Sequence, residues 1–280
     1  MTPRIGLAYN PTIDAALELR ERAAGWLRVR QIDHWVSAAG DFDLLVRELP
    51  KTDALIVLGG DGTFLRAARA VAEVDVPLLG VNLGKVGFLS KIEANQLESM
   101  LAQVVANEYT LDPRMAARAT IYPGGSAAPG PTFIALNDVV VARGTLARVC
   151  RLDVAIGTSH LATFIADGLV VSTPTGSTGY SFSAGGPILD PTSRNLIVTP
   201  IAGYLSAIRS VVVSPRQVVR CRIVDAAEAL ISIDGREDRP VAVGDVVAVE
   251  AVDRPIRLIE PHGSLPFWDL LRHKVELLPS

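Results

Sequence analysis

The feature that most constrains this fold is an apolar run that ends in a glycine-rich turn. Residues 55–58 read Leu-Ile-Val-Leu, residues 59–63 read Gly-Gly-Asp-Gly-Thr, and a helix-like segment runs from Phe64 to Val71. A strand that turns through glycines into a helix is typical of α/β proteins, and the helix start offers free N–H groups to an anion. Asp61 would repel that anion unless it binds a metal or takes up a proton, so the turn indicates phosphate chemistry.

The alternative role for Asp61 is a helix N-cap, whose side chain would accept a nearby backbone N–H. We expect Thr63 to cap the helix instead, which leaves Asp61 available for chemistry. The turn matches neither the Walker sequence nor the Gly-x-Gly-x-x-Gly dinucleotide fingerprint.

Short apolar runs alternate with helical patterns through the first third of the chain. Strands are predicted at 5–9, 54–58 and 76–81, and helices at 15–27, 63–72 and 94–107. This alternation predicts a parallel sheet covered on both faces, with ligands at the carboxyl ends of its strands. The domain is expected to span 1–112 and 258–280, because helical spacing over 265–277 predicts a C-terminal helix that returns to it.

Strand patterns dominate after Asp112-Pro113. Apolar and polar residues alternate at 149–156 and 219–223, and further strands are predicted at 229–233 and 241–249. Residues 113–257 are therefore expected to form a mostly antiparallel all-β domain, a sandwich or a barrel. The predicted fold class is an α/β N-terminal domain with a parallel sheet plus an all-β, sandwich-like C-terminal domain.

Composition narrows the class of protein. The 280 residues are 49% hydrophobic and carry a formal net charge of -3, which argues against nucleic acid as a partner. Cys150 and Cys221 lack metal-ligand spacing, and no apolar run is long enough to span a bilayer. The N-terminal residues lack the apolar core of a signal peptide. We expect a cytoplasmic, enzyme-like chain with no membrane partner.

Three further segments are candidates for ligand contacts. The segment from Asn82 to Leu89 follows a predicted strand, and its glycines and Phe88 suit contact with a flat ring of a ligand. A tight turn with Phe88 in the core explains the same sequence equally well. Residues 172–186 are dense in hydroxyls and glycines, so we expect an ordered loop that hydrogen-bonds a nucleoside rather than a flexible linker. Asn137-Asp138 interrupts a β run, which suits either a ribose diol or a simple strand end. No histidine cluster or Ser-His-Asp arrangement is readable.

These motifs together resemble the NAD kinase family, in order and spacing, over nearly the whole chain. The resemblance rests on Gly59–Thr63, Asn82–Leu89, Asn137-Asp138, and Asp167-Gly168 with Thr173–Tyr180. Gly-Gly-Asp-Gly-Thr is shared with phosphofructokinases and with diacylglycerol and sphingosine kinases, whereas the Thr-Pro-Thr-Gly-Ser-Thr run is more specific to NAD kinases. That family phosphorylates the 2′-hydroxyl of the adenosine ribose of NAD to make NADP.

The resemblance implies a role for each matching residue. Asp61 would accept the proton of the 2′-hydroxyl, with Gly59, Gly60 and Thr63 in the phosphate loop. The implied substrate contacts are Gly62, Phe88 (adenine), Asn137 and Asp138 (ribose), Arg148, Asp167 (the nicotinamide half), Thr178, Gly179, Tyr180, Ser181, Phe182, Ser183 and Arg236. No protein residue is expected to be a metal ligand.

Three positions depart from the family pattern. Asp138 stands where glutamate is usual, which shortens the reach of the carboxylate, and water then fills the gap. Gly179 stands where alanine is usual. Arg236 stands where glutamine is common, and its added cation favours a phosphorylated ligand.

The resemblance also implies the reaction partners. ATP with Mg²⁺ is the expected phosphoryl donor, inorganic polyphosphate is the alternative, and NAD is the acceptor. A homodimer or homotetramer is expected. Two other functions remain open at this point, a diacylglycerol- or sphingosine-type lipid kinase and a non-catalytic NAD sensor. Asp61 argues against the sensor, because a carboxylate beside phosphates would weaken plain binding.

Overall fold

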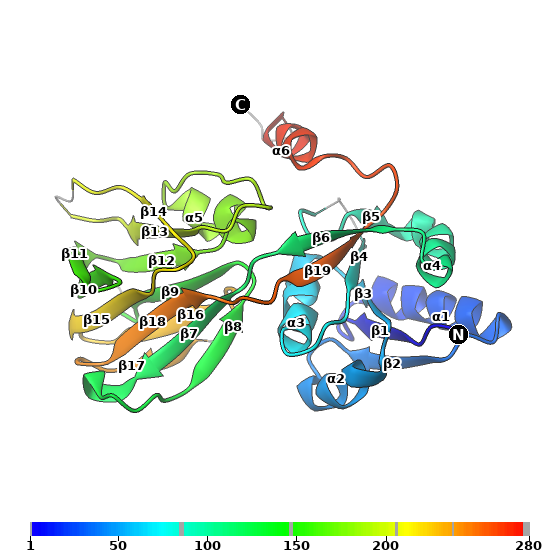
Figure 1. Cartoon of the computed structure of the whole chain (residues 1–280), viewed down its shortest axis with the longest axis horizontal. Coiled ribbons are helices and arrows are strands. Elements are labelled where there is room, and N and C mark those ends of the chain that lie inside the picture. Colours follow the sequence, from blue (N-terminus) through cyan, green and yellow to red (C-terminus); the bar gives the residue numbers. More distant parts are fainter. Residues whose placement is uncertain (1, 84–86, 146–147, 205–206, 237, 277–280) are drawn as a thin grey trace. The chain divides into compact units, whose positions relative to one another are not determined.

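The computed structural model describes residues 2–83, 87–145, 148–204, 207–236 and 238–276, with side chains as far as Lys274. The chain forms two compact units (Figure 1). Unit 1 comprises residues 1–113 and 256–280, and unit 2 comprises residues 114–255.

A largely parallel sheet forms the centre of unit 1. Its strands run in the order β2-β1-β3-β4-β19-β6, and β5 pairs with β4. Their bounds are β1 Ile5–Tyr9, β2 His34–Ala38, β3 Ala54–Leu58, β4 Leu78–Asn82, β5 Ile92–Glu93, β6 Thr110–Arg114 and β19 Ile256–Glu260. Every residue of β3 and β4 is buried, which explains why both strands read as apolar runs.

Helices cover this sheet. They are α1 Asp14–Val29, α2 Phe42–Glu48, α3 Asp61–Val71 and α4 Leu97–Ala106, with 3-10 turns η1 Leu49–Lys51 and η2 Ala94–Gln96. Helix α6 Phe267–Glu276 follows β19 near the end of the chain. Apolar side chains of α1 and α4, including Leu19, Leu27 and Leu101, share one core with Ile5 and Ile56 of the strands. Helix α3 buries Phe64 and Leu65, and it packs against α2, β3 and β4.

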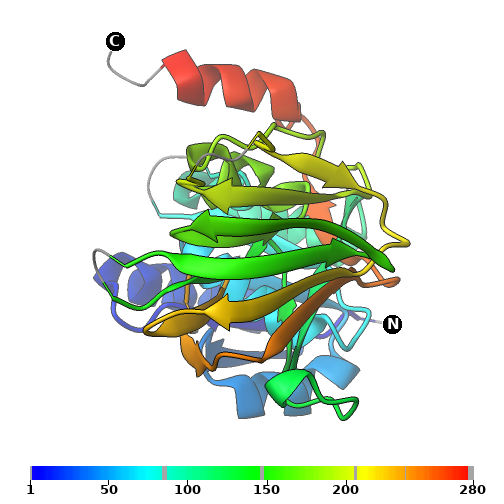
Figure 2. The ribbon, with the colours of Figure 1, turned by 90° about the vertical axis from the view of Figure 1, so that its left-hand side faces the viewer.

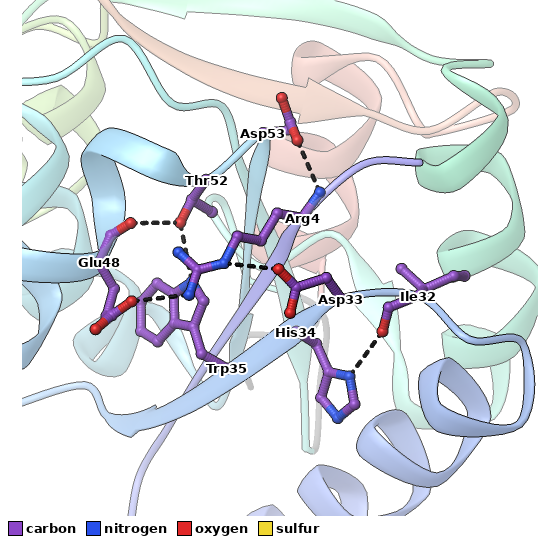
Figure 3. A network of polar contacts seen from close by, with 8 residues as sticks. All are labelled: Arg4, Ile32, Asp33, His34, Trp35, Glu48, Thr52 and Asp53. Carbon is purple, nitrogen blue, oxygen red and sulfur yellow. Dashed lines mark hydrogen bonds and ion pairs between the residues drawn. The ribbon is translucent and has the colours of Figure 1, made fainter. Parts of the chain in front are cut away.

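A polar network ties together the amino ends of the three strands β1, β2 and β3 (Figure 3). Arg4 precedes β1, and its backbone N–H donates to Asp53, just before β3, at 2.7 Å. Its guanidinium bonds Asp33, just before β2, at 3.0 Å and Glu48 of α2 at 2.8 Å. The glycine loop follows the opposite, carboxyl end of β3. This network therefore stabilises the sheet and is not part of the glycine-loop site.

Two antiparallel sheets build unit 2, in the orders β11-β10-β15-β18-β7-β8 and β14-β13-β12-β9-β16-β17. Figure 2 shows the second sheet face on, in green to orange. The strands are β7 Ala117–Tyr122, β8 Thr132–Ala135, β9 Asp138–Arg143, β10 Cys150–Ile156, β11 Ser159–Ala166, β12 Gly168–Ser172, β13 Leu196–Ile201, β14 Val211–Val213, β15 Val219–Asp225, β16 Ala229–Ile233, β17 Arg239–Val241 and β18 Val246–Ala251. Both sheets contribute to one apolar core, so the unit is a β-sandwich.

Short helical turns interrupt this sandwich. They are η3 Pro123–Gly125, η4 Thr175–Thr178 and α5 Tyr180–Ser183. The hydroxyl-rich run after β12 is therefore ordered, as its apolar flanks predict. Both cysteines are buried free thiols, and burial raises the pKa of Cys221 to about 12.

The predicted fold class is confirmed, and four details of the sequence prediction are wrong. β2 and α2 were not expected. Residues 241–249 do not form one strand, because Gly244 turns the chain at a φ of 94° between β17 and β18. The predicted boundary at 257/258 cuts through β19, which pairs with β4 of unit 1. Gly60, not Thr63, occupies the N-cap position of α3.

Candidate functional site

The Asp61 carboxylate is held by the loop that follows the neighbouring strand. Asp61 is the first residue of α3, separated from β3 by Gly59 and Gly60, and β4 lies beside β3 in parallel. Oδ2 accepts the backbone N–H of Phe88 at 3.1 Å, and Oδ1 accepts those of Leu89 and Ser90 at 3.2 and 3.1 Å. Asp61 is therefore not a helix cap; its side chain links the ends of two adjacent strands.

Two glycines make this arrangement possible. A Cβ on Gly87 would overlap the Asp61 carboxylate, so only glycine lets the loop approach the acid. A Cβ on Gly80 of β4 would lie 2.8 Å from the Leu89 carbonyl oxygen and from the Ser90 Cα. The loop thus rests directly on the strand. Residues 84–86 of the same motif lie outside the described residues.

The start of α3 offers N–H groups to an anion. The N–H of Thr63 and of Phe64 point back to the Gly60 carbonyl, at 2.8 and 3.1 Å. The N–H groups of Asp61 and Gly62 lie in the first turn, where a helix supplies no acceptor of its own. Gly59 sits at a φ of 156° with its space filled by the buried Thr63 side chain. Thr63 therefore shapes the loop by packing.

A second carboxylate, Asp234, organises the ligand-binding candidates of unit 2. Its Oδ1 accepts the N–H of Asn137 at 2.7 Å and of Asp138 at 3.1 Å, and its Oδ2 accepts the N–H of Leu136 at 3.1 Å. Asp234 itself has a φ of 52°, a conformation that aspartate tolerates better than most residues. These bonds fix the turn between β8 and β9 that carries Asn137 and Asp138.

Asn137 and Asp138 sit at the end of the turn with polar atoms available. Asn137 Oδ1 is buried and has no hydrogen-bond partner within the described part of the chain. Asp138 is only 5% exposed, and burial, followed by the charge of Asp234, raises its pKa to about 7. At neutral pH the Asp138 carboxyl is therefore partly protonated, and it both donates and accepts hydrogen bonds.

The hydroxyl-rich loop packs on the backbone of this same turn. The Thr173 N–H donates to the Asn137 carbonyl at 2.8 Å, and the Thr173 hydroxyl donates to the Leu136 carbonyl at 2.6 Å. A Cβ on Gly176 would overlap the Asn137 backbone. A Cβ on Gly179 would lie 4.0 Å from Asp138 Oδ2, so this loop and Asp138 adjoin.

The residues at the end of the loop that were predicted to contact a ligand fall into two groups, exposed and buried. Tyr180 and Phe182 are about half exposed, and Ser183 is exposed, so all three are available to a ligand. Thr178 is half-buried and directs its hydroxyl to the Thr175 carbonyl at 3.5 Å. Ser181 is fully buried, with its hydroxyl 3.5 Å from that of Thr199. The expectation for Ser181 is therefore corrected, because its side chain faces the interior.

The remaining predicted residues lie farther along unit 2. Asp167 accepts a two-pronged ion pair from Arg143, at 2.7 Å from Nε and 3.1 Å from Nη2. The hydrogen bond to Asp167 raises the pKa of Arg143. Arg148 and Arg236 are exposed, and the Arg236 N–H bonds the Ile233 carbonyl at 3.1 Å.

Sequence reasoning missed Arg143 and the roles of Gly87 and Asp234. The signal for Asp234 was present, since an Asp-Gly pair after an apolar strand is typical of a turn with positive φ. Arg143 gave no signal, because its partner Asp167 is 24 residues away.

No cage of three or more His, Cys, Asp or Glu side chains occurs among the described residues. None of the helices in this described part of the chain is both long enough and apolar enough to cross a bilayer.

The fold and the glycine loop place the chain in a class: phosphotransferases with a two-domain α/β-plus-β-sandwich architecture. Family models for the ATP-NAD kinase N-terminal domain and C-terminal domain match residues 44–109 and 136–261. The chain is 38% identical to an NAD kinase of Dehalococcoides mccartyi over 276 residues, covering 99% of this chain and 97% of that protein. The chain belongs to the NAD kinase family, so the predicted resemblance is confirmed.

Solved structures share the fold. A yeast NADH kinase crystallised with NADH superposes with a TM-score of 0.88 at 22% identity, covering 100% of this chain and 89% of that one. An Archaeoglobus fulgidus NAD kinase in complex with ATP gives a TM-score of 0.78 at 24% identity, covering 99% and 100%. Neither the lipid kinase nor the sensor alternative gains support from these comparisons.

Proposed function

We propose that this protein transfers the terminal phosphoryl group of ATP to the 2′-hydroxyl of the adenosine ribose of NAD. The observation that carries the proposal is the placement of Asp61, a carboxylate at the start of a helix that otherwise suits anions. Membership of the NAD kinase family supports the substrate assignment.

Asp61 retains the capacity to act as proton acceptor despite its three bonds. A carboxylate has about four lone-pair sites. Among the described residues, two N–H groups bond Oδ1 and one bonds Oδ2, which leaves one site on Oδ2 for a ribose hydroxyl. The fixed loop also holds the acid in one orientation, which favours proton transfer at the moment of attack.

Unit 2 supplies the groups that suit a nucleoside. Asn137 presents an acceptor in need of a donor, and the partly protonated Asp138 accepts and donates, which together match a ribose diol. Exposed Tyr180 and Phe182 provide apolar faces for a base. Phe88, half-buried on the Asp61 loop, is proposed to line the adenine. Roles for Asp167, Arg148 and Arg236 rest on the family resemblance alone.

The donor is proposed to be ATP with a divalent cation such as Mg²⁺. Since no carboxylate cage is found in the described residues, the donor phosphates themselves would hold the cation, as Mg²⁺ commonly is in kinases. Bound in that way, the cation neutralises charge on the transferring group. The first-turn N–H groups of α3 supply a complementary anion contact.

The test is direct. Purified protein is incubated with NAD, Mg²⁺ and either ATP or inorganic polyphosphate, and NADP is measured by mass spectrometry. Formation of NADP with release of ADP supports the proposal. NAD binding without NADP from either donor would contradict it and support the sensor. A parallel incubation with NADH reports the preferred acceptor.

We also propose that the enzyme is a homo-oligomer joined through the β-sandwich. β11 and β14 are edge strands of the two sheets, and a cavity of about 440 Å³ between them is lined by Ile156, Leu161 and Val211–Val213. Val212 is 48% exposed there. Unprotected apolar edge strands invite pairing with another chain, here a second copy of this one.

Light scattering after size exclusion checks this interface. The wild type is expected to run as a dimer or tetramer and Val212→Lys as a smaller species. An unchanged molar mass for Val212→Lys would show that this edge does not form the interface. A cytoplasmic location is proposed as well, in keeping with two buried cysteines that form no disulfide.

A further inference from the structure

Among residues 87–90, the described part of the loop that holds Asp61, the Phe88 side chain is the one that the sheet does not cover. Leu89 is 5% exposed and Ser90 is fully buried, both against the strand side, whereas the Phe88 ring is only half-buried. Phe88 is also the residue whose N–H bonds Asp61 Oδ2, the oxygen assigned to the ribose hydroxyl. Whatever packs on that ring therefore influences the orientation of the acid.

Helix α6 packs on that ring. The rings of Phe267 and Phe88 are 5.9 Å apart between centroids at 44°, within the range of favourable aromatic pairs. Lys274, two turns further along α6, places Nζ 5.1 Å from the same ring centroid. Phe267 is itself supported by the edge of Trp268 at 4.9 Å. Leu270, 5% exposed, is the buried residue of α6 among the side chains described, 267–274.

The loop and the segment leading to α6 share a second anchor. Lys91, directly after Ser90, forms an ion pair with Glu260 at 2.5 Å and lies 3.7 Å from Asp112. Glu260 ends β19, and the chain from there reaches α6 within a few residues. The segment between β19 and α6 is therefore anchored at both ends. Glu260 pairs with Lys91, just after the Asp61 loop, and Phe267 contacts Phe88 within that loop.

The geometry points to Phe267 as a positioning residue for Asp61, acting through the Phe88 ring and the three N–H groups of residues 88–90. This inference deepens the proposed function and rests on it for its effect on turnover. Among the described residues, no hydrogen bond, ion pair or ring contact joins Phe267 to Asp61 or to the start of α3. Phe267 therefore acts on Asp61 by holding the loop in place. Loss of the Phe267 ring would let the loop shift and misdirect Oδ2.

Two measurements test the inference on full-length protein. Phe267→Ala is expected to lower kcat about tenfold with little change in the KM for NAD, the size of effect that one aromatic pair can supply. Phe267→Tyr should restore most of the loss, since it keeps the ring. Hydrogen exchange at the amides of 87–90 should accelerate in Phe267→Ala, without acceleration in β1 or β3.

Two controls separate positioning from general damage. Leu265→Ala removes a half-exposed apolar side chain just before α6 and should change neither kcat nor exchange in the loop. Adding Phe267→Ala to a Phe88→Leu background should cost little further kcat, because the ring through which it acts is gone.

Unchanged exchange at 87–90 in Phe267→Ala, or full additivity with Phe88→Leu, would overturn the inference. If the wild type makes no NADP, the proposed function fails, yet exchange at 87–90 still tests the contact independently.

Discussion

Asp61 in unit 1 and Asp234 in unit 2 accept the same pattern of hydrogen bonds. Each takes two backbone N–H groups on Oδ1 and one on Oδ2, from three consecutive residues of a distant loop. Their surroundings differ, because Asp234 is 8% exposed while Asp61 is half-buried at the start of a helix. The bonding pattern alone therefore does not mark a catalytic acid; access to the remaining lone pair does.

The largest expected effect is that of Asp61→Asn. Losing a positioned general base typically lowers turnover by about 10²–10⁴-fold. The new NH₂ group also opposes one of the three N–H donors of the loop. We expect kcat to collapse while NAD binding by calorimetry persists. Asp41→Asn is the control, since Asp41 caps α2 and asparagine caps a helix equally well. Near-normal turnover by Asp61→Asn would erase the distinction between the two carboxylates.

Asp234→Ala should act on stability first. It strands three N–H groups, of which Leu136 and Asp138 are buried, and hydrogen bonds to a charged group contribute about 1.5–3 kcal/mol each. We expect a loss of about 3 kcal/mol or more in the free energy of unfolding, measured with urea. Asp234→Asn should recover part of it, because asparagine tolerates positive φ and keeps one acceptor. If Asp61→Ala lost as much stability as Asp234→Ala, the two carboxylates would have the same structural role, and the contrast between them would be contradicted.

Gly87→Ala probes the approach of the loop to Asp61. The added Cβ would overlap the carboxylate, so the acid or the loop must move. We expect kcat to fall about tenfold or more, since small misplacements of catalytic groups are costly. Gly25→Ala in α1 is the matched control, because its Cβ would meet nothing within 4 Å. Equal activity in both variants would show that the Asp61 carboxylate tolerates displacement.

The last predicted effect is a pH dependence of stability that arises from Asp138. Its folded pKa of about 7 lies above the unfolded value near 3.9, so the folded state holds the proton more tightly. Stability from this group is full below about pH 4 and declines as pH rises through about 7. Asp138→Asn should remove this decline, gaining roughly 2 kcal/mol relative to wild type between pH 5 and pH 8. Parallel pH profiles of unfolding for both proteins would contradict it.

The sequence predicted what depends on neighbouring residues and missed what depends on distant pairing. β3 and the turn at Asp61 were readable because apolar residues and glycines follow each other directly. β2, with the sequence His-Trp-Val-Ser-Ala, is only partly buried and shows no clear apolar pattern. β19 joins β4 through a pairing of Leu258 with Leu78, which no local pattern reveals.

The candidate site divides in the same way. Asp61, Asn137 and Asp138 were identified from their local setting and from the family resemblance. The donors to Asp61 lie 27–29 residues away, and the Asp234 acceptor of Asn137 and Asp138 lies 97 and 96 residues away. These hydrogen-bond partners therefore could not be predicted from the sequence. The short helix α5 buries the Ser181 side chain while Tyr180 and Phe182 on either side are exposed, a difference that the sequence does not show.

The buried thiols carry a practical consequence. The chain has two cysteines, both enclosed in the sandwich core, and burial raises the pKa of each. Maleimide dyes react with accessible thiolates, so the native protein should take up little label. A cysteine introduced at an exposed site such as Ser183 would then carry a single fluorophore, and ligand docking near the hydroxyl-rich loop could be followed by its emission without first removing the natural cysteines.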